Sequence, residues 1–396
     1  MAIEIKRAAG RPLLFRVEER LEACGIADWV AVTGASPLFM KAPFLLAFEE
    51  AMPDTLKPRY GVLTDGDVPV AVMSGQLLAL HADRIPSGAA AEAAPKLVRS
   101  VMSRVRARIF MWGNFMGWGT SGMALAPGAD PQALWPLVTQ AIDRAGDADE
   151  AIRSASLQLV LDISPRETLA ARSLEKLGFR PMKAEPDMVL ALDPSWESFE
   201  HYRGALKSKY RKASVDMDEA LARAGCVIER VSDLEGHADE LIALHVQVHE
   251  QSVNRFVTLK RALFPALSRH LGERFSCTVL RDPSRILGFI TTIIDGDTAL
   301  AYVVGHDVEA NRELPIYLRL LQTAIEDGIR HRCRRVTYGR TALEPKARLG
   351  AVAASLTVYG RHTNPVIGPL VTKFLQQLAP AGEPPQRNPF KGQGPA

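Results

Sequence analysis

The sequence predicts an α/β (α+β) fold of two domains, each a mixed, mostly antiparallel sheet flanked by helices. At 396 residues the chain is too long for one compact hydrophobic core. The same order of expected elements also occurs twice: helices, antiparallel strands, a long helix, a strand, a short helical segment and a strand. The segment 194–200, after LALDPSW, is the natural boundary. We therefore expect domains over 1–195 and 196–378.

In the first half, apolar spacing and turn residues predict the elements in chain order. Asp130-Pro131, for example, is a cap and first-turn pair typical of the start of a helix. We expect a helix over 43–52, a hairpin over 60–80, a helical insertion over 88–107, a strand or loop over 108–128, a helix over 131–145, a buried strand over 156–163, a short helix over 168–179 and a closing strand over 187–193.

The second half repeats this order. We expect a polar helix over 198–224, a strand over 225–231, two helices across 233–270, three strands across 275–307, a strongly amphipathic helix over 314–332, a strand over 334–339, a helical segment over 344–351 and a final strand over 352–360. The Pro/Gly-rich tail, residues 379–396, has few side chains to bury, so we expect it to be disordered.

The composition is that of a globular protein. The formal net charge of +3 is close to balance and by itself indicates no polyanionic partner. The four cysteines are scattered without a CxxC pair, which predicts reduced thiols and neither a disulfide framework nor a zinc site. The N-terminus lacks the apolar core of a signal peptide, and no window is apolar enough to span a membrane. We expect a soluble, cytoplasmic protein.

The element order and two residue patterns resemble a known fold. The stretch ARSLEKLGF (171–179) is similar to the short late helix of many GNAT acyltransferases. The segment 302–361 and the basic stretch LKSKYRKA (206–213) resemble tandem GNAT-like proteins related to the Fem aminoacyl transferases. The residues that carry this second likeness are Tyr302, Gly305, Asp307, Tyr317, Gly339, Arg340, Lys346 and Gly350. The resemblance implies acyl transfer from acyl-CoA or an aminoacyl-tRNA.

One departure from the GNAT pattern concerns the donor. Typical GNAT enzymes carry a [Q/R]-x-x-G-x-[G/A] loop before the long helix, whose backbone N–H groups bind the pyrophosphate of acyl-CoA. At that place this chain has HDVEANRELP (306–315) in the second half and LAPGADPQA (125–133) in the first. Neither fits, which keeps both donors open.

The candidate catalytic residues are His306, Asp307 and Tyr302. In the GNAT fold the chemistry lies where the fourth and fifth strands diverge, and these are titratable residues near that place in the second half. His306 or Asp307 could deprotonate the attacking amine, and Tyr302 or Tyr338 could return a proton to the leaving group. The alternative interpretation is that His306-Asp307 only ends a strand and caps a turn.

A second group of residues is expected to bind substrate. Gly339 at a strand end allows a ligand to approach the backbone, and Arg340 with Lys346 suits a phosphate or carboxylate. Tyr338 and, from the resemblance, Tyr317 complete this group. The alternative is a glycine turn beside two solvated cations. The basic run 207–212 could contact RNA or CoA phosphates, although a solvated helix face is the simpler account.

Two further motifs do not support a site. The stretch 117–122 matches G-x-G-x-x-G, but an apparent strand follows it where a dinucleotide site needs a helix. His245 and His249 share a helix face, yet no third ligand is evident, so we expect packed or surface histidines and no metal. The first half offers little chemistry and is expected to be a degenerate copy.

The sequence thus predicts an N-acyltransferase whose second domain moves an acyl or aminoacyl group from an activated donor to an amine of a small molecule or peptide. The alternative is a non-catalytic GNAT-like binding or scaffold protein in a polysaccharide or envelope pathway. A third option is direct RNA binding through residues 203–212.

Overall fold

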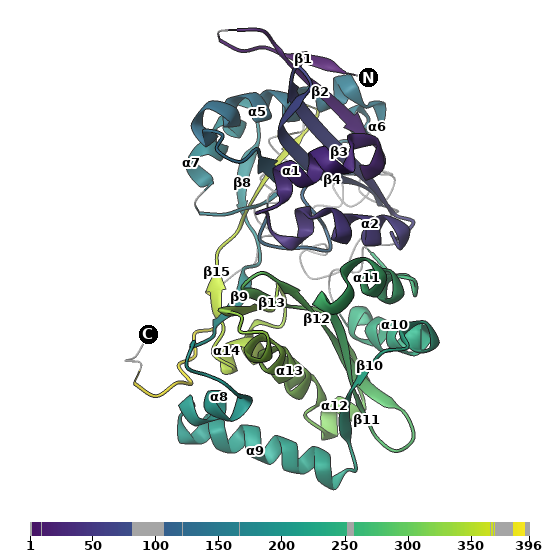
Figure 1. The fold of residues 1–396 in the computed structure, drawn as a ribbon, viewed down its shortest axis with the longest axis vertical. Helices are drawn as coiled ribbons and strands as arrows, with labels where there is room; N and C mark the ends of the chain where they lie inside the picture. Colours follow the sequence, from purple (N-terminus) through teal and green to yellow (C-terminus); the bar gives the residue numbers. More distant parts are fainter. Residues whose placement is uncertain are drawn as a thin grey trace. The chain divides into compact units, whose positions relative to one another are not determined.

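A computed structural model describes residues 2–8, 10–80, 107–120, 122–165, 167–251, 257–364, 366, 368 and 383–392 (Figure 1). The expected helical insertion over 88–107 lies outside these residues, apart from its last position. The chain divides into two compact units. Unit 1 comprises Met1–Glu185, Arg255–Val257 and Ser355–Ala381, and unit 2 comprises Pro186–Asn254, Thr258–Ala354 and Gly382–Ala396. Each unit is an α/β structure built on one sheet, as the sequence predicts.

The sheet of unit 1 has the order β1-β2-β3-β4-β5-β7-β16-β8, with β6 paired to β4. Its neighbours are antiparallel except β5 and β7, which run parallel. The strands are β1 (Ile3–Ile5), β2 (Leu13–Glu18), β3 (Leu56–Asp65), β4 (Val68–Leu80), β5 (Ala107–Trp112), β6 (Met123–Leu125), β7 (Leu157–Ile163), β8 (Arg180–Lys183) and β16 (Thr357–His362). The helices are α1 (Ile26–Thr33), α2 (Ala42–Glu50), α5 (Pro131–Ala148), α6 (Glu150–Arg153) and α7 (Thr168–Ala171).

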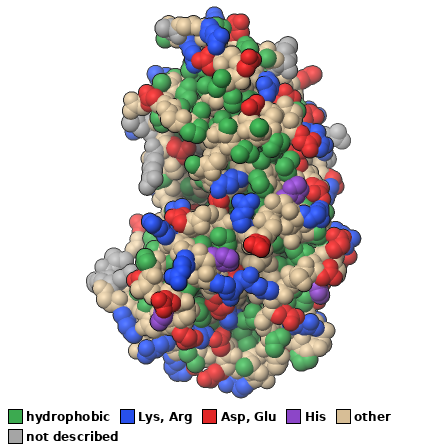
Figure 2. Space-filling view, viewed as in Figure 1, with side chains coloured by type: hydrophobic (Ala, Val, Ile, Leu, Met, Phe, Trp, Pro, Cys, Tyr) green, Lys and Arg blue, Asp and Glu red, His purple; other side chains and the backbone are tan. Residues whose placement is uncertain are grey.

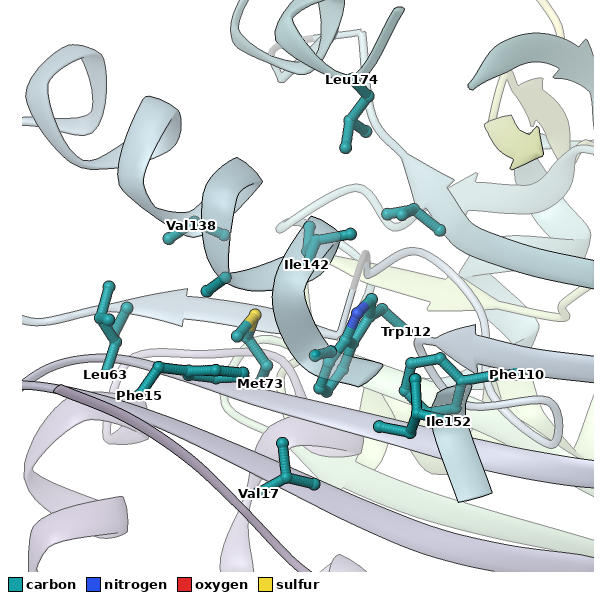
Figure 3. Packing of buried hydrophobic residues seen from close by; sticks show 14 of the residues in the cluster. Phe15, Val17, Leu63, Met73, Phe110, Trp112, Val138, Ile142, Ile152 and Leu174 are labelled. Atoms are coloured by element: carbon teal, nitrogen blue, oxygen red, sulfur yellow. The ribbon is translucent and has the colours of Figure 1, made fainter. Parts of the chain in front are cut away.

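The core of unit 1 lies between the sheet and α5. The alternation in β2 buries Leu13, Phe15 and Val17 on one face of the strand. Figure 3 shows Phe15 and Val17 in the same cluster as Ile142 of α5. Burial of such apolar side chains is the main force that holds helix and sheet together.

The sheet of unit 2 has the order β10-β11-β12-β13-β14-β9-β15, with β13 and β14 parallel and the other neighbours antiparallel. The strands are β9 (Asp187–Ala191), β10 (Val227–Val231), β11 (Phe275–Arg281), β12 (Ile286–Asp295), β13 (Thr298–His306), β14 (Arg335–Thr337) and β15 (Val352–Ala354). The helices are α8 (Phe199–Ala205), α9 (Ser208–Arg223), α10 (Leu234–Glu250), α11 (Leu263–Leu271), α12 (Ala310–Glu313), α13 (Ile316–Arg330) and α14 (Leu343–Arg348).

Two glycines allow helices to approach the sheet of unit 2 closely. A side chain at Gly288 would collide with Ile316 and Leu320 of α13, and one at Gly305 would collide with the backbone of His245 in α10. Gly288 pairs with His306 in the β12–β13 ladder, and Gly305 directly precedes His306 in β13. Because successive residues of a strand point to opposite faces, α13 and α10 cover opposite faces of the sheet (Figure 1).

The expected closing strands belong to the opposite sheets. Residues 187–193 were expected to close the first sheet, but β9 lies between β14 and β15 in unit 2, where Leu190 pairs with Val336. Residues 352–360 were expected to form one last strand of the second sheet. They divide into β15, which stays in unit 2, and β16, which lies between β7 and β8 in unit 1. A short apolar run predicts a strand but not its partner, so this expectation is wrong.

Two smaller expectations are also corrected. The polar helix over 198–224 is two helices, α8 and α9, separated at Leu206 and Lys207. The tail 379–396 was expected to be disordered, but residues 383–392 pack on unit 2. The Phe390 ring lies 5.6 Å from that of Trp196 and 5.9 Å from that of Tyr202, between ring centroids. These ring contacts hold part of the segment that the composition predicted to be disordered.

Candidate active site

Strands β13 and β14 diverge in unit 2. Their ladder has three residue pairs and ends at Leu300 and Thr337, whereas β13 continues to His306. From Ala301 onward, the β13 edge that faces away from β12 therefore has no strand partner in the described part of the chain. We call this place the opening. It lies where the GNAT resemblance led us to expect the chemistry.

A β-bulge marks the start of the opening. Ile290 pairs with Val304 and Thr292 with Ala301, so Tyr302 and Val303 together lie opposite Thr291. The Thr291 hydroxyl oxygen fills the bulge: it accepts from Val303 N at 2.9 Å and lies 3.3 Å from Val303 O. Burial raises the pKa of Tyr302, so its phenol stays protonated at neutral pH.

His306 ends β13 on the face that α13 covers. Its ring lies 5.5 Å from that of Tyr317, and the side chain is 9% exposed. Burial lowers the pKa of His306, outweighing the opposite effect of Asp307, so the imidazole is neutral at neutral pH. Within the described residues its buried Nδ1 has no hydrogen-bond partner. This histidine is therefore able to accept a proton.

Asp307 is differently placed. Its carboxylate accepts a hydrogen bond from Ala310 N at 2.8 Å and pairs with Arg285 Nη1 at 2.5 Å. The Ala310 N–H, with Arg285, holds the pKa of Asp307 below its ordinary value. These contacts make Asp307 an ionised cap at the start of α12. This corresponds to the alternative interpretation from the sequence, in which Asp307 ends a strand and caps a turn.

The structure adds His245, which sequence reasoning left as a packed or surface residue. It is half-buried, and its Nδ1 lies 3.2 Å from Val304 O on β13. Burial lowers the pKa of His245 to about 4, so this ring is also neutral. Its only signal in the sequence was its spacing from His249, whose ring stacks on it at 5.9 Å. That spacing could not show that α10 places the ring against β13.

The predicted binding residues lie together at the end of β14. Lys346 is 3% exposed, and its ammonium donates to the carbonyl oxygens of Tyr338, Gly339 and Arg340 at 2.8, 3.1 and 2.6 Å. Asp187 accepts from Gly339 N at 2.9 Å. Lys346 therefore has backbone partners where the sequence suggested an anionic ligand, and it organises the turn that carries Arg340.

This turn is strained. Thr341 and Ala342 both have positive φ angles, 61° and 43°, directly after Gly339 at 64° and Arg340. Two adjacent non-glycine residues in this region are uncommon and persist only where the surroundings hold them. Such strain is frequent at ligand sites, and here it lies where β14 leaves β13.

The two tyrosines of the binding group differ. Tyr317 faces His306, and burial raises its pKa to about 12. Tyr338 is buried in the core, and its hydroxyl donates to Leu321 O of α13 at 3.2 Å. The structure thus brings His306 and Tyr317 together on the β13 side of the opening, whereas Tyr302 lies in the bulge opposite Thr291. Gly339, Arg340 and Lys346 form its β14 side.

The N-terminus of α13 already has internal partners. Ile316 N donates to Leu314 O and Tyr317 N to Asn311 Oδ1, both at 2.8 Å, and Pro315 has no N–H group. These are two of the first-turn N–H groups that would bind a pyrophosphate at a helix N-terminus. In unit 1 the corresponding helix, α5, is capped by Asp130, which accepts from Gln132 N at 2.9 Å.

Unit 1 offers no comparable arrangement in its described residues. The G-x-G-x-x-G stretch leads into β6, which pairs with β4, so no helix follows it. A polar hollow of about 510 Å³ contains Arg59, but that guanidinium is paired with Asp149 at 2.6 Å and Glu19 at 2.9 Å. Its charge is already neutralised, and we therefore place the candidate site in unit 2 instead.

Comparison with known proteins identifies a family for one segment of the chain and structures that share its fold. Residues 208–347 match the family described as acetyltransferase (GNAT) domain. Among curated proteins, none is significantly similar to the chain in sequence. Three solved structures share the fold over nearly their whole lengths.

The first of these structures is FemX, with a TM-score of 0.55, 10% identity, and 90% of this chain and 99% of that one covered. A tandem GNAT protein from the clavulanic acid biosynthesis pathway has a TM-score of 0.51 and 12% identity, over 89% and 99% of the two chains. A conserved protein of unknown function from Bacteroides thetaiotaomicron has a TM-score of 0.51 and 12% identity, over 87% and 98%.

The fold is therefore that of the tandem GNAT proteins, with two GNAT-like units in one chain. The matched segment contains β13, the opening and most of α14. This segment lies in unit 2, which is therefore the part of the chain that is similar in sequence to a GNAT acetyltransferase domain, while the tandem fold is shared with FemX.

Proposed function

We propose that unit 2 transfers an acyl or aminoacyl group from an activated donor to an amine, and that the reaction takes place at the opening between β13 and β14. The observation that carries this proposal is His306, a buried, neutral imidazole with an unpartnered Nδ1 at the end of the unpaired strand edge. Acyl transfer to an amine requires such a proton acceptor.

In the proposed reaction the amine nitrogen attacks the acyl carbonyl carbon, and His306 Nδ1 takes the proton that the nitrogen loses. The carbonyl oxygen becomes an oxyanion, which backbone N–H groups on the unpaired edge of β13 can stabilise. The bond to the donor oxygen or sulfur then breaks. Tyr302, protonated because burial raises its pKa, supplies the proton to that leaving group.

The internal partners at α13 favour aminoacyl-tRNA over acyl-CoA as the donor. The N–H groups of Ile316 and Tyr317, which a CoA pyrophosphate would use, already bond to the chain. Basic and acidic side chains are interspersed on the face shown in Figure 2, so an RNA donor would meet no uniformly positive surface there. Helix α9 contributes local cations, Lys209 and Arg211. A cytoplasmic location, where such donors are made, fits the free thiols of Cys24, Cys226, Cys277 and Cys333.

The test supplies the protein with radiolabelled acetyl-CoA or radiolabelled aminoacyl-tRNA, together with lysine, glucosamine or a lysine-containing peptide as acceptor. We expect labelled amide product with the aminoacyl-tRNA and little with acetyl-CoA. Product from acetyl-CoA alone would overturn the donor assignment but keep the acyl transfer. No product from either donor, while either donor still binds, would favour the non-catalytic alternative.

In the described residues no helix has the length and apolar character of a membrane span.

A further inference from the structure

The C-terminal segment, residues 383–392, makes specific backbone contacts with unit 2, and we call it the strap. Leu206 and Phe390 form a β-bridge between the two segments. Lys207 N donates to Pro389 O at 2.7 Å, and Lys391 N donates to Ala205 O at 2.9 Å. A tail that merely rests on a surface would not pair its backbone in this way. In Figure 1 the yellow strap passes beside α8 and α14.

The strap also closes the junction between α8 and α9. The Lys391 ammonium donates to Gly204 O at 2.6 Å, and the Lys207 ammonium donates to Asn388 O at 3.0 Å. Gly204 and Ala205 end α8, and the last carbonyl groups of a helix have no partner within the helix. The strap supplies partners for these groups.

The aromatic part of the strap fits against Gly350, just beyond α14. Gly350 has a φ angle of 97°, and a side chain there would collide with the Phe390 ring. Tyr202, which packs edge-on against the same ring, donates its hydroxyl to Leu349 O at 3.0 Å. The C-terminal end of α14 is thus enclosed between Phe390 and Tyr202.

The other end of α14 is held by an ion pair. Arg387 donates from Nε and Nη2 to Glu344 Oε1 at 3.0 and 2.7 Å, and Glu344 lies in the first turn of the helix. The Arg387 guanidinium holds the pKa of Glu344 below its ordinary value. The strap therefore contacts α14 at its start and just past its end.

Helix α14 carries Lys346, whose three hydrogen bonds hold Tyr338, Gly339 and Arg340 at the opening. We propose that the strap is a positioning element for the candidate active site. By fixing both ends of α14, it sets the strained turn from Gly339 to Ala342, with Phe390 and Arg387 as its two anchors. This inference concerns the conformation of the turn and does not depend on the reaction proposed above.

Hydrogen exchange on the full-length protein tests the strap. We compare the wild type with Phe390→Ala, with the conservative Phe390→Leu and with Gln386→Ala, which changes an exposed strap residue as a matched control. In Phe390→Ala, amides over 338–350 should exchange about tenfold faster, while amides of β11 keep the wild-type rate. Phe390→Leu should restore most of the protection, and Gln386→Ala should match the wild type.

Faster exchange in 204–207 and 387–391 with wild-type exchange over 338–350 would overturn the proposal, because the strap would then be a passive cover. If amides throughout Phe390→Ala exchange fast, the variant is globally destabilised, and Arg387→Gln then provides the test. This variant removes only the ion pair and should still speed exchange over 338–350; wild-type exchange there would again overturn the proposal.

A kinetic readout complements the exchange. With whichever donor gives product, Phe390→Ala should raise the acceptor KM several-fold more than it lowers kcat, because the turn would be displaced rather than the proton acceptor removed. Equal effects on both constants would contradict a positioning role. If the wild-type protein transfers no acyl group, the proposed function is refuted. The proposal about the strap is then tested by the hydrogen-exchange data alone.

Discussion

At the scale of single residues, Lys346 shows how a predicted ligand-binding residue can act through the backbone. A glycine turn next to Arg and Lys indicated a site for an anion. The ammonium is instead buried and bonded to three carbonyl oxygens. Burial of a charged group requires full hydrogen bonding, and these carbonyls provide it. What remains available for a ligand is the turn itself.

We predict that Lys346→Met destabilises the protein by about 3 kcal/mol, because three carbonyl oxygens lose their donor in a buried place. Urea unfolding followed by fluorescence measures the change. The control is Lys209→Met, which changes an exposed residue of α9 and should shift the free energy of unfolding by less than ~0.5 kcal/mol. Similar values for the two variants would contradict the role given to Lys346.

His245 predicts a pH dependence of stability. Its folded pKa of about 4 lies below the ordinary value of 6.5 because burial disfavours the charged ring. Its stabilising effect is therefore present above pH 6.5 and is lost as the pH falls toward 4. Between pH 7 and pH 5 this histidine should account for a loss of about 2 kcal/mol. His306, whose pKa is also lowered, adds to the loss in the same direction.

The measurement is urea unfolding of the wild type and His245→Gln at both pH values. The variant should lose much less stability between pH 7 and pH 5 than the wild type, whereas the exposed control His201→Gln should behave as the wild type does. A variant with the wild-type loss would show that another group titrates in this range.

At the scale of elements, the exchange of closing strands is the feature that sequence could not supply. The strands of unit 2 over 275–307 and the helix over 314–332 were predicted nearly as observed, since their periodicity and turns are local properties. The partner of a strand depends on contacts far away in sequence. Residues 187–191 and 357–362 would form strands whether they joined the sheet of their own half or that of the other half. Only the packed structure shows which sheet contains each of them.

The candidate site was predictable to a similar degree. Tyr302, His306 and the turn at Gly339 lie at strand ends, so the order of elements led to them. His245 belongs to a helix that is distant in sequence from β13, and the Asp187 that holds Gly339 comes from the exchanged β9. His245 carried only its spacing from His249 as a signal, and Asp187 carried none. The strap was missed because a segment rich in proline and glycine gives no periodicity.

The strand exchange has a direct test. Tyr359→Ala in β16 creates a cavity in the core of unit 1 and should loosen β7, where Tyr359 pairs with Val160. Hydrogen exchange over 157–163 should become about tenfold faster, and exchange over 335–337 should stay unchanged. The mirror variant Leu190→Ala, in β9, should do the reverse. Faster exchange of β14 in Tyr359→Ala would contradict the observed topology.

At the scale of the whole molecule, the chain combines two GNAT-like units of unequal chemical content. Within the described residues, unit 2 has the diverging strands, a neutral histidine with an unpartnered nitrogen, and a strained turn held from a neighbouring helix. In unit 1 the segment after β5 is bonded within itself and to β4: Asn114 Oδ1 accepts from Met116 N at 2.9 Å and from Gln76 Nε2 of β4 at 3.3 Å. This contrast supports our assignment of transfer to unit 2.

The most direct test of that assignment is single-turnover transfer of label to an amine by the wild type, His306→Gln and the control His201→Gln, measured from pH 5 to pH 8. His306→Gln should be at least about 100-fold slower, because the proton acceptor is lost. The wild-type rate should fall only below pH 6.5, since the pKa of His306 is lowered, and this fall should be absent in His306→Gln. His201→Gln should match the wild type. Wild-type rates in His306→Gln would contradict the account, because the reaction would then take place elsewhere.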